Sequence, residues 1–288
     1  MTLPAPDPSS LPEPDPSSLP APLPPSLTGE KAVLRLTFDG PLAVLTMDSA
    51  PMNLFDEAMW GAWADAVAWL TARPPRALLV RAEGRVVSAG VDVQVFADLD
   101  PADAESFWRT QLGITRALEA LPCPTVFAAH SLTLTAAFEL ALACDLVVAT
   151  AQARFGLVER KVGFTPSMGG TQRLALRAGP SRARELVMTG DLYRGSVLAD
   201  WGVVNALLPQ ATFDTDARAY AMRLATGPTR AHRATKEIVR RYLADGLAAA
   251  DDALPGIAAD VTGSADHRRA VAAFLTDGPE HRTEYEGR

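Results

Sequence analysis

The sequence predicts an α/β fold, in which a strand-containing core is followed by an α-helical C-terminal region. Two observations predict it. Up to residue 149, short apolar and β-branched runs alternate with longer segments whose apolar residues recur at helical spacing. From Pro180 onward almost every segment has helical spacing. Strands that alternate with helices are typical of a sheet covered by helices.

The predicted elements follow one another from residue 32. Two strand-like runs flank the Asp-Gly-Pro turn at residues 39–41, which is a β-hairpin signal. Apolar residues at helical spacing then predict a helix that the Pro-Pro pair at 74–75 ends. Later elements are assigned in the same way. We expect strands at residues 32–37, 42–47, 77–82, 125–128 and 145–149, and helices at residues 56–70, 101–120, 136–143, 181–188, 214–226, 229–243 and 266–275.

Composition divides the chain into three segments. Residues 3–26 repeat the pattern LPAPDPSS, LPEPDPSS, LPAPLPPS, and so much Pro and Ser cannot form a packed core. We therefore expect residues 1–29 to be a disordered tail, either inert or a docking arm for a partner that binds proline-rich peptides. Residues 30–210 are expected to form the α/β core, and residues 211–288 the helical C-terminal region.

Composition also excludes several function classes. The formal net charge is −7, whereas nucleic-acid-binding proteins usually carry a clustered basic excess. Cys123 and Cys144 are expected to be buried free thiols, and the four scattered histidines form no metal-binding motif. The uncharged stretch 120–138 contains prolines and polar residues, so we interpret it as turn, strand and helix start. With no apolar leader at the N-terminus, we expect a cytoplasmic protein that binds no nucleic acid, membrane or metal.

No phosphate-binding loop, dinucleotide-binding glycine motif or GxSxG elbow is present. The segments that remain are SAGVDV (88–93), TAAFELALACDLVVA (135–149) and FGLVERKVGFTPSMGGTQRL (155–174). The second predicts a helix start with Thr135 as N-cap. The first amides of a helix lack intrahelical partners, so the N–H of Ala136 is a candidate oxyanion donor. The small-residue turn at 88–91 is suited to expose a second donor.

Two glutamates stand in these segments. Glu139 lies three residues after Ala136 in an otherwise apolar helix, and Glu159 follows a short apolar stretch. Taken alone, such a carboxylate is paired, solvent-facing or functional, because burying it unpaired is costly. Two glutamates that flank a thioester site can share acid and base roles, since neighbouring carboxylates push their pKa values apart.

These segments resemble the crotonase (enoyl-CoA hydratase/isomerase) superfamily, and the similarity runs from about Val33 to the end of the chain. It also includes ARELVMTGD, DWGVVNALLP and GSADHRRAVAAFL. The resemblance implies a spiral of ββα repeats with a helical C-terminal region that forms a homotrimer, often a dimer of trimers. It implies an acyl-CoA thioester substrate, with coenzyme A as part of the substrate and no separate cofactor.

By this resemblance, the amides of Val91 and Ala136 form the oxyanion hole, and Glu139 and Glu159 are the catalytic glutamates. One glutamate helps to activate a water, while Glu159 exchanges a proton with the α-carbon. The acyl-CoA nucleotide is expected to run along Val91, Asp92, Val93 and Gln94.

The chain departs from the family pattern at three places. Thr-Ala-Ala at 135–137 replaces a glycine-rich run, and the added methyl groups narrow the acyl channel. His-Ser at 130–131 replaces a common Asn-Gly, which bears on the loop geometry. Ala50 stands where the family often has a basic residue near the nucleotide, which bears on the affinity for CoA.

Three functions remain open. The first is an enoyl-CoA hydratase, a lyase that adds water across a trans-2-enoyl thioester. The second keeps the oxyanion hole but isomerises, dehydrates or decarboxylates a CoA or carrier-protein thioester in secondary metabolism. The third is a non-catalytic crotonase-fold scaffold. The presence of both glutamates favours the hydratase.

Overall fold

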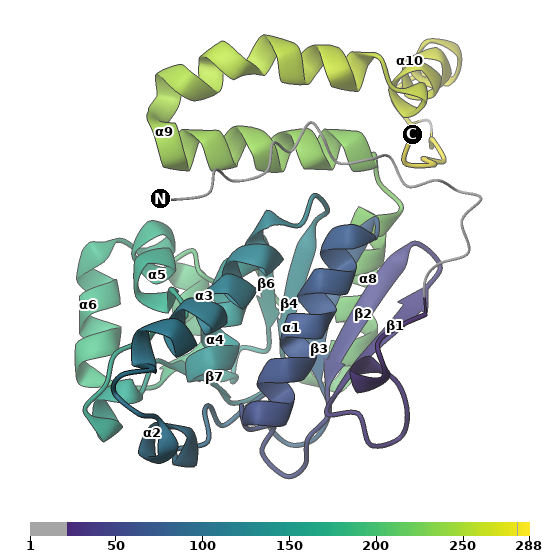
Figure 1. The fold of residues 1–288 in the computed structure, drawn as a ribbon. Coiled ribbons are helices and arrows are strands. Elements are labelled where there is room, and N and C mark those ends of the chain that lie inside the picture. The colour runs from purple at the N-terminus through teal and green to yellow at the C-terminus, as the bar shows by residue number, and fades with distance from the viewer. Residues whose placement is uncertain (1–21, 281) are drawn as a thin grey trace.

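A six-stranded sheet forms the centre of the protein. The computed structural model describes residues 22–280 and 282–288, and Figure 1 shows their arrangement. The strand order is β1-β2-β3-β4-β6-β9. β1 and β2 pair as the predicted antiparallel hairpin, and the later neighbours pair in parallel. The bounds are β1 Leu34–Asp39, β2 Leu42–Met47, β3 Ala77–Ala82, β4 Thr125–Ala129, β6 Leu146–Ala149 and β9 Ala206–Leu207.

Helices cover both faces of this sheet (Figure 1). One face carries α1 (Glu57–Ala72), α3 (Ala104–Ala120) and α4 (Thr135–Ala143), and the other carries α8 (Phe213–Ala225). The alternation of side chains along a strand produces the two layers. In β3, Leu78 and Val80 join the larger core cluster with α1, whereas Ala77 and Leu79 pack in the cluster of α8. The predicted α/β fold is therefore confirmed.

A second, three-stranded sheet lies against α4 and is absent from the sequence expectations. Its strands have only two or three residues, too few to show an alternating pattern. Its bounds are β5 Thr133–Leu134, β7 Arg154–Gly156 and β8 Tyr193–Arg194. The remaining short elements are α2 Gln94–Asp98, α5 Gly170–Ala178, α6 Pro180–Thr189 and α7 Gly195–Asp200, with 3₁₀ helices η2 Pro25–Leu27, η3 Glu159–Val162 and η4 Gln210–Thr212.

The C-terminal region is helical, as predicted. α9 (Thr229–Thr262) turns back on itself at Gly246, whose φ of 85° is not helical, and α10 (Ala265–Asp277) follows. Figure 1 shows the two halves of α9 stacked on one end of the core. Lys236 in the first half donates to Asp145 Oδ2 at 2.7 Å. This ion pair ties the first half of α9 to the start of β6.

The C-terminal boundary of the predicted tail was wrong. Residues 1–21 lie outside the described residues, but the segment that follows them is part of the fold. Pro25–Leu27 form η2, and Leu27 is 1% exposed within the main core cluster. Ser26 Oγ donates to Asp65 Oδ2 of α1 at 2.6 Å. The predicted disordered tail therefore does not reach residue 29, because Leu27 packs in the core.

The expectation for the two cysteines is confirmed. Cys123 and Cys144 are free and buried, as predicted, and burial raises the pKa of each thiol to about 12. Among the described residues, no helix combines the length and apolar character needed to cross a membrane.

Candidate functional site

Glu139 lies in the protein interior, on the fully buried helix α4. The residue is 3% exposed, and its Oε2 accepts hydrogen bonds from the backbone N–H groups of Met168 at 2.9 Å and Gly170 at 2.7 Å. Gly170 begins α5, so the carboxylate lies at a helix N-terminus, where the helix dipole favours negative charge. The solvent-facing interpretation of Glu139 is thereby excluded.

The turn that binds Glu139 depends on two glycines. Gly169 has a φ of 93°, in the left-handed region that favours glycine. A Cβ at Gly170 would lie 2.6 Å from Cγ of Glu139, so a side chain there would displace the carboxylate. Arg173 donates to the carbonyl oxygen of Gly169 at 3.2 Å and to Glu119 of α3 at 3.0 Å, which fixes the turn. Sequence reasoning missed this role, because it arises only when α4 packs against α5.

Glu159 is the second buried acid. It begins η3, is 7% exposed, and has one carboxyl oxygen, Oε2, without a hydrogen-bond partner among the described residues. Burial raises the pKa of Glu159 to about 8, with a further contribution from the charge of Glu139. Such an electrostatic contribution falls with distance, so the two predicted glutamates are near enough for their charges to interact.

The two acids differ in their surroundings and hence in proton affinity. Burial raises the pKa of Glu139 to about 7, against the opposing effect of the N–H groups of Gly170 and Met168. The free oxygen of Glu159 has no such donors. Hydrogen bonds to a carboxylate favour its charged form, so the two N–H donors favour ionisation of Glu139, whereas the charge of Glu139 favours the protonated form of Glu159.

The two predicted oxyanion donors belong to neighbouring segments. The N–H of Val91 donates to Thr135 Oγ1 at 3.1 Å, and Ala136 is the next residue. Ala136 is the second residue of α4, where an amide has no acceptor within its own helix. The start of α4 and the turn that carries Val91 therefore meet, as a two-amide site requires.

Thr135 does not have the predicted N-cap role. The N-cap of α4 is Leu134, and no side chain caps the helix. A capping residue has extended backbone angles, whereas Thr135 has a φ of 46° in the left-handed region. The prediction was wrong because this backbone conformation turns the hydroxyl toward Val91 and away from the first amides of α4.

Short strands hold the three site segments together. A β-bridge pairs Ser88 with Thr133, and the N–H of Leu134 donates to the carbonyl oxygen of Ser88 at 3.1 Å. β5 pairs in parallel with β7, with Leu134 opposite Gly156, three residues before Glu159. Backbone hydrogen bonds thus fix the turn that carries Val91, the start of α4 and the segment of Glu159 relative to one another.

The run predicted to contact the nucleotide lies at the surface. Asp92 and Val93 precede α2 and Gln94 begins it, and Val93 is 61% exposed. Asp92 Oδ1 accepts a hydrogen bond from the N–H of Gln94 at 3.0 Å, which orders the turn. Nucleotide binding along this run stays a prediction.

Known proteins share this fold and sequence pattern. The enoyl-CoA hydratase/isomerase family model matches residues 37–284. The chain belongs to this family. The probable enoyl-CoA hydratase echA8 of Mycobacterium bovis is 33% identical over 171 residues, which are 59% of this chain and 66% of that protein. The carnitinyl-CoA dehydratase of Salmonella typhimurium is 32% identical over 209 residues, which are 72% of this chain and 80% of that enzyme.

Solved structures of the enoyl-CoA hydratase/isomerase family share the same architecture. A Streptomyces coelicolor A3(2) protein superposes with a TM-score of 0.86 and 29% identity, covering 95% of this chain and all of that chain (100%). Enoyl-CoA hydratase subunit I of Geobacillus kaustophilus HTA426 gives a TM-score of 0.81 at 29% identity, covering 89% of this chain and 98% of that chain. The predicted crotonase-like fold is thereby confirmed.

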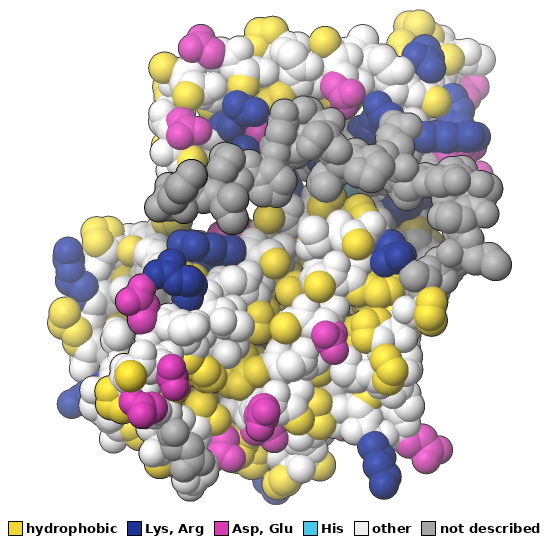
Figure 2. Space-filling model, in the orientation of Figure 1, with side chains coloured by type: hydrophobic (Ala, Val, Ile, Leu, Met, Phe, Trp, Pro, Cys, Tyr) yellow, Lys and Arg dark blue, Asp and Glu magenta, His cyan; other side chains and the backbone are white. Residues whose placement is uncertain are grey.

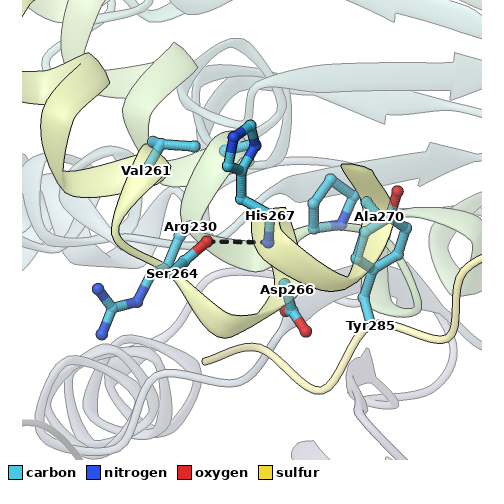
Figure 3. A pocket seen from close by; sticks show the side chains of 9 residues that line it. Arg230, Val261, Ser264, Asp266, His267, Ala270 and Tyr285 are labelled. Carbon is cyan, nitrogen blue, oxygen red and sulfur yellow. Dashed lines mark hydrogen bonds between the residues drawn. The ribbon is translucent and has the colours of Figure 1, made fainter. Parts of the chain in front are cut away.

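A pocket of this family member lies apart from the glutamates, between α9 and α10 (Figure 3). Its polar groups are engaged by the fold: Ser264 Oγ accepts from the N–H of His267 at 3.1 Å, and Asp266 accepts from the N–H groups of Glu286 and Gly287. The lining residues are Pro228, Arg230, Ala231, Val261, Ser264, Asp266, His267, Ala270 and Tyr285. The hydrogen bonds to Asp266 fix the C-terminal segment against the start of α10. In the part of the chain that the structure describes, no cluster of His, Cys, Asp and Glu is suited to hold a metal ion.

Proposed function

We propose that the protein is an enoyl-CoA hydratase, which adds water across a trans-2-enoyl thioester to give a 3-hydroxyacyl thioester. The observation that carries the proposal is the pair of buried glutamates, of which Glu139 accepts two backbone hydrogen bonds and Glu159 has an unpartnered carboxyl oxygen among the described residues. A pKa of about 7 for Glu139 and about 8 for Glu159 suits a base and an acid that work near neutral pH. Membership of the enoyl-CoA hydratase/isomerase family supports this class of reaction.

The proposed chemistry begins at the thioester oxygen, which accepts hydrogen bonds from the amides of Val91 and Ala136. These donors make the β-carbon electrophilic and stabilise the enolate that forms. The Glu139 carboxylate takes a proton from water as the water oxygen bonds to the β-carbon. The enolate then takes a proton from Glu159 at its α-carbon, which restores the carbonyl group. Return of a proton from Glu139 to Glu159 completes the cycle.

Burial of both acids argues against the non-catalytic scaffold. A carboxyl group that is buried with an unpartnered oxygen, as at Glu159, costs stability. A scaffold would gain stability from apolar residues at both positions, whereas an enzyme uses the raised pKa values. The glutamate pair therefore supports a catalytic site.

Turnover of crotonyl-CoA, followed as loss of the absorbance of the conjugated enoyl group, tests the proposal. We expect hydration by the wild-type protein and almost none by Glu139→Gln. No turnover of crotonyl-CoA or of longer enoyl-CoA substrates, in a protein that binds butyryl-CoA, would reject the hydratase proposal and favour the second candidate.

The second candidate is an isomerase, dehydratase or decarboxylase of secondary metabolism, acting on a CoA or carrier-protein thioester. Similarity to the carnitinyl-CoA dehydratase of Salmonella typhimurium favours dehydration. The contact of Thr135 with Val91 also favours it, because it alters the proposed oxyanion turn. Turnover rates of the same acyl group, as a CoA thioester and as a carrier-protein thioester, show which of the two substrates the enzyme uses.

We also propose that the chain forms a homotrimer, or a dimer of trimers, through α9 and α10. Figure 2 shows hydrophobic side chains among the charged ones on these helices. Large apolar surfaces of this kind usually mark interfaces. On α9 and α10 the exposed large apolar residues are Val239, Tyr242, Leu243, Leu247, Leu254, Val271, Phe274 and Leu275.

A further inference from the structure

The hydroxyl of Thr135 lies where the thioester oxygen is expected. Its Oγ1 accepts a hydrogen bond from the N–H of Val91 at 3.1 Å, and Val91 is one of the two proposed oxyanion donors. A Cβ placed on Gly90 would lie 2.5 Å from the same Oγ1, so the hydroxyl packs directly over the backbone of the turn. The threonine side chain thus fills the acceptor position of the Val91 amide.

The backbone holds the Thr135 side chain in this position at a cost. The residue is 7% exposed, and its φ of 46° is unfavourable for a β-branched side chain. Its neighbours allow little relaxation, because Thr133–Leu134 form β5 and α4 begins at Thr135 itself. Strained residues of this kind gather at functional sites. Among the described residues, no hydrogen-bond acceptor is found for the Thr135 hydroxyl hydrogen, so the hydrogen bond of this hydroxyl is the one it accepts from Val91.

We propose that the Thr135 hydroxyl is a built-in occupant of the oxyanion hole, which the thioester oxygen displaces when substrate binds. The inference rests on the proposed function, through the role of the Val91 amide. A single N–H makes one good hydrogen bond, so the two oxygens compete for it. Displacement requires rotation about χ1 of Thr135. The site then has a closed and an open state, and the apparent affinity for a thioester is reduced by the fraction that is open.

This competition favours ligands that place an oxygen at the acceptor position of the Val91 amide. A thioester oxygen gains two amide donors, Val91 and Ala136, whereas an apolar group in the same position gains none. Charge that develops on the substrate oxygen strengthens its hydrogen bonds beyond those of a neutral hydroxyl. Thr135 is therefore a specificity-determining residue, and its effect falls on substrate binding and KM more than on kcat.

Two CoA ligands that are not hydrated test the displacement. Butyryl-CoA has the thioester carbonyl oxygen, and S-butyl-CoA, a thioether, lacks it. Thr135→Gly removes the hydroxyl and accepts the positive φ, whereas the control Thr135→Ser retains the hydroxyl. We expect Thr135→Gly to bind butyryl-CoA at least ~5-fold more tightly than the wild type, the scale of one net hydrogen bond. Binding of S-butyl-CoA should not change, and Thr135→Ser should match the wild type.

Two results of the binding experiment would overturn the proposal. Equal tightening of both ligands by Thr135→Gly would mean that the glycine only widens the acyl channel. Weaker binding of butyryl-CoA would mean that the hydroxyl assists the thioester instead of competing with it.

Hydrogen exchange of the Val91 amide tests the contact without a ligand. Thr135→Val replaces the hydroxyl by a methyl group of similar shape, so we expect Val91 exchange to rise at least ~5-fold, the scale of one lost hydrogen bond. Thr135→Ser should keep the wild-type rate. Equal exchange in the wild type and Thr135→Val would overturn the inference whatever the CoA ligands do. Faster exchange together with no binding of either CoA ligand would instead overturn the proposed function, and displacement by a thioester with it.

Discussion

The charge of Glu139 adds to the effect of burial in raising the pKa of Glu159 to about 8. Two backbone N–H groups at the start of α5 hold Oε2 of Glu139 and favour its charged form. A carboxylate whose charged form is favoured by hydrogen bonds, together with an acid whose pKa is raised, suits the addition of water to an enoyl thioester. Both the activity and the stability of the protein should therefore depend on pH.

The pH profile of kcat/KM should be a narrow bell. We expect activity to rise as pH passes about 7, where Glu139 loses its proton and becomes able to activate water. It should fall as pH passes about 8, where Glu159 loses the proton that the α-carbon needs. Because the two acids interact, the apparent pKa values of the two limbs describe the pair and not either residue alone. Steady-state rates with crotonyl-CoA measure the profile, and a flat profile across this range contradicts the assigned roles.

Substitution of either glutamate by glutamine should reduce kcat by at least ~10²-fold, the usual scale for a lost acid or base. The fold, checked by circular dichroism, and the affinity for butyryl-CoA should be retained. The double variant should lose far less than the product of the single effects, because the pair acts as one unit.

Exchange of the α-proton identifies which acid serves the α-carbon. Glu159→Gln should abolish exchange of the α-protons of butyryl-CoA with deuterated solvent. Normal exchange in Glu159→Gln would mean that another group serves the α-carbon, and the hydratase roles would be abandoned even though the family assignment stands.

Glu159→Gln should stabilise the protein at high pH. The pKa of the folded state lies above the ordinary value of 4.5, so the folded protein holds this proton more tightly than the unfolded chain. That contribution is fully present below about pH 4.5 and is lost as pH rises through about 8. In thermal unfolding, the variant and the wild type should have similar Tm values near pH 4.5. Above about pH 8 the Tm of the variant should be higher, by about 2–4 °C for each kcal/mol of added stability. Glu30→Gln, at an exposed residue, is the control.

Negative charges introduced on the C-terminal helices should dissociate the proposed trimer. Leu247 and Leu275 are 65% and 78% exposed in the single chain. The double substitution Leu247→Glu and Leu275→Glu should convert the trimer into a monomer, because charged groups are costly to bury in an apolar interface. Analytical sedimentation measures the change. Met188→Glu, at a residue that is 68% exposed on α6, is the matched control. A wild-type protein that sediments as a clean monomer at micromolar concentration would refute the assembly.

The N-terminal segment should divide into a dispensable part and a structural part. Deletion of residues 1–21 should leave Tm and activity nearly unchanged, because their Pro and Ser composition supplies no core. Leu27→Ala should destabilise the protein by about 2–5 kcal/mol, the range for a buried leucine. Denaturant unfolding measures both effects, and a large loss of stability on deletion of 1–21 would contradict this division.

The sequence by itself determined the family and most of the longer elements, although the helix predicted at 229–243 continues as α9 to Thr262. The apolar periodicity that predicts α1 and the hairpin at the Asp-Gly-Pro turn are local patterns, and the structure has both. Prediction failed for β5, β7, β8 and β9, because strands of two or three residues are specified by the partners they meet. Leu27 escaped prediction for the same reason, since only the packing of η2 on α1 makes it a core residue.

Only the tertiary structure decided the state of the candidate site. Glu139 and Glu159 are named by resemblance to a family, but neither burial nor protonation can be read from local sequence. The folded chain brings the amides of the α5 turn to Glu139 and leaves an oxygen of Glu159 without a partner. It also turns the hydroxyl of Thr135 from the expected N-cap to the Val91 amide, 44 residues away in sequence. Proton affinity and hydrogen bonding depend on which groups meet in space, and for residues far apart in the chain that is settled by packing.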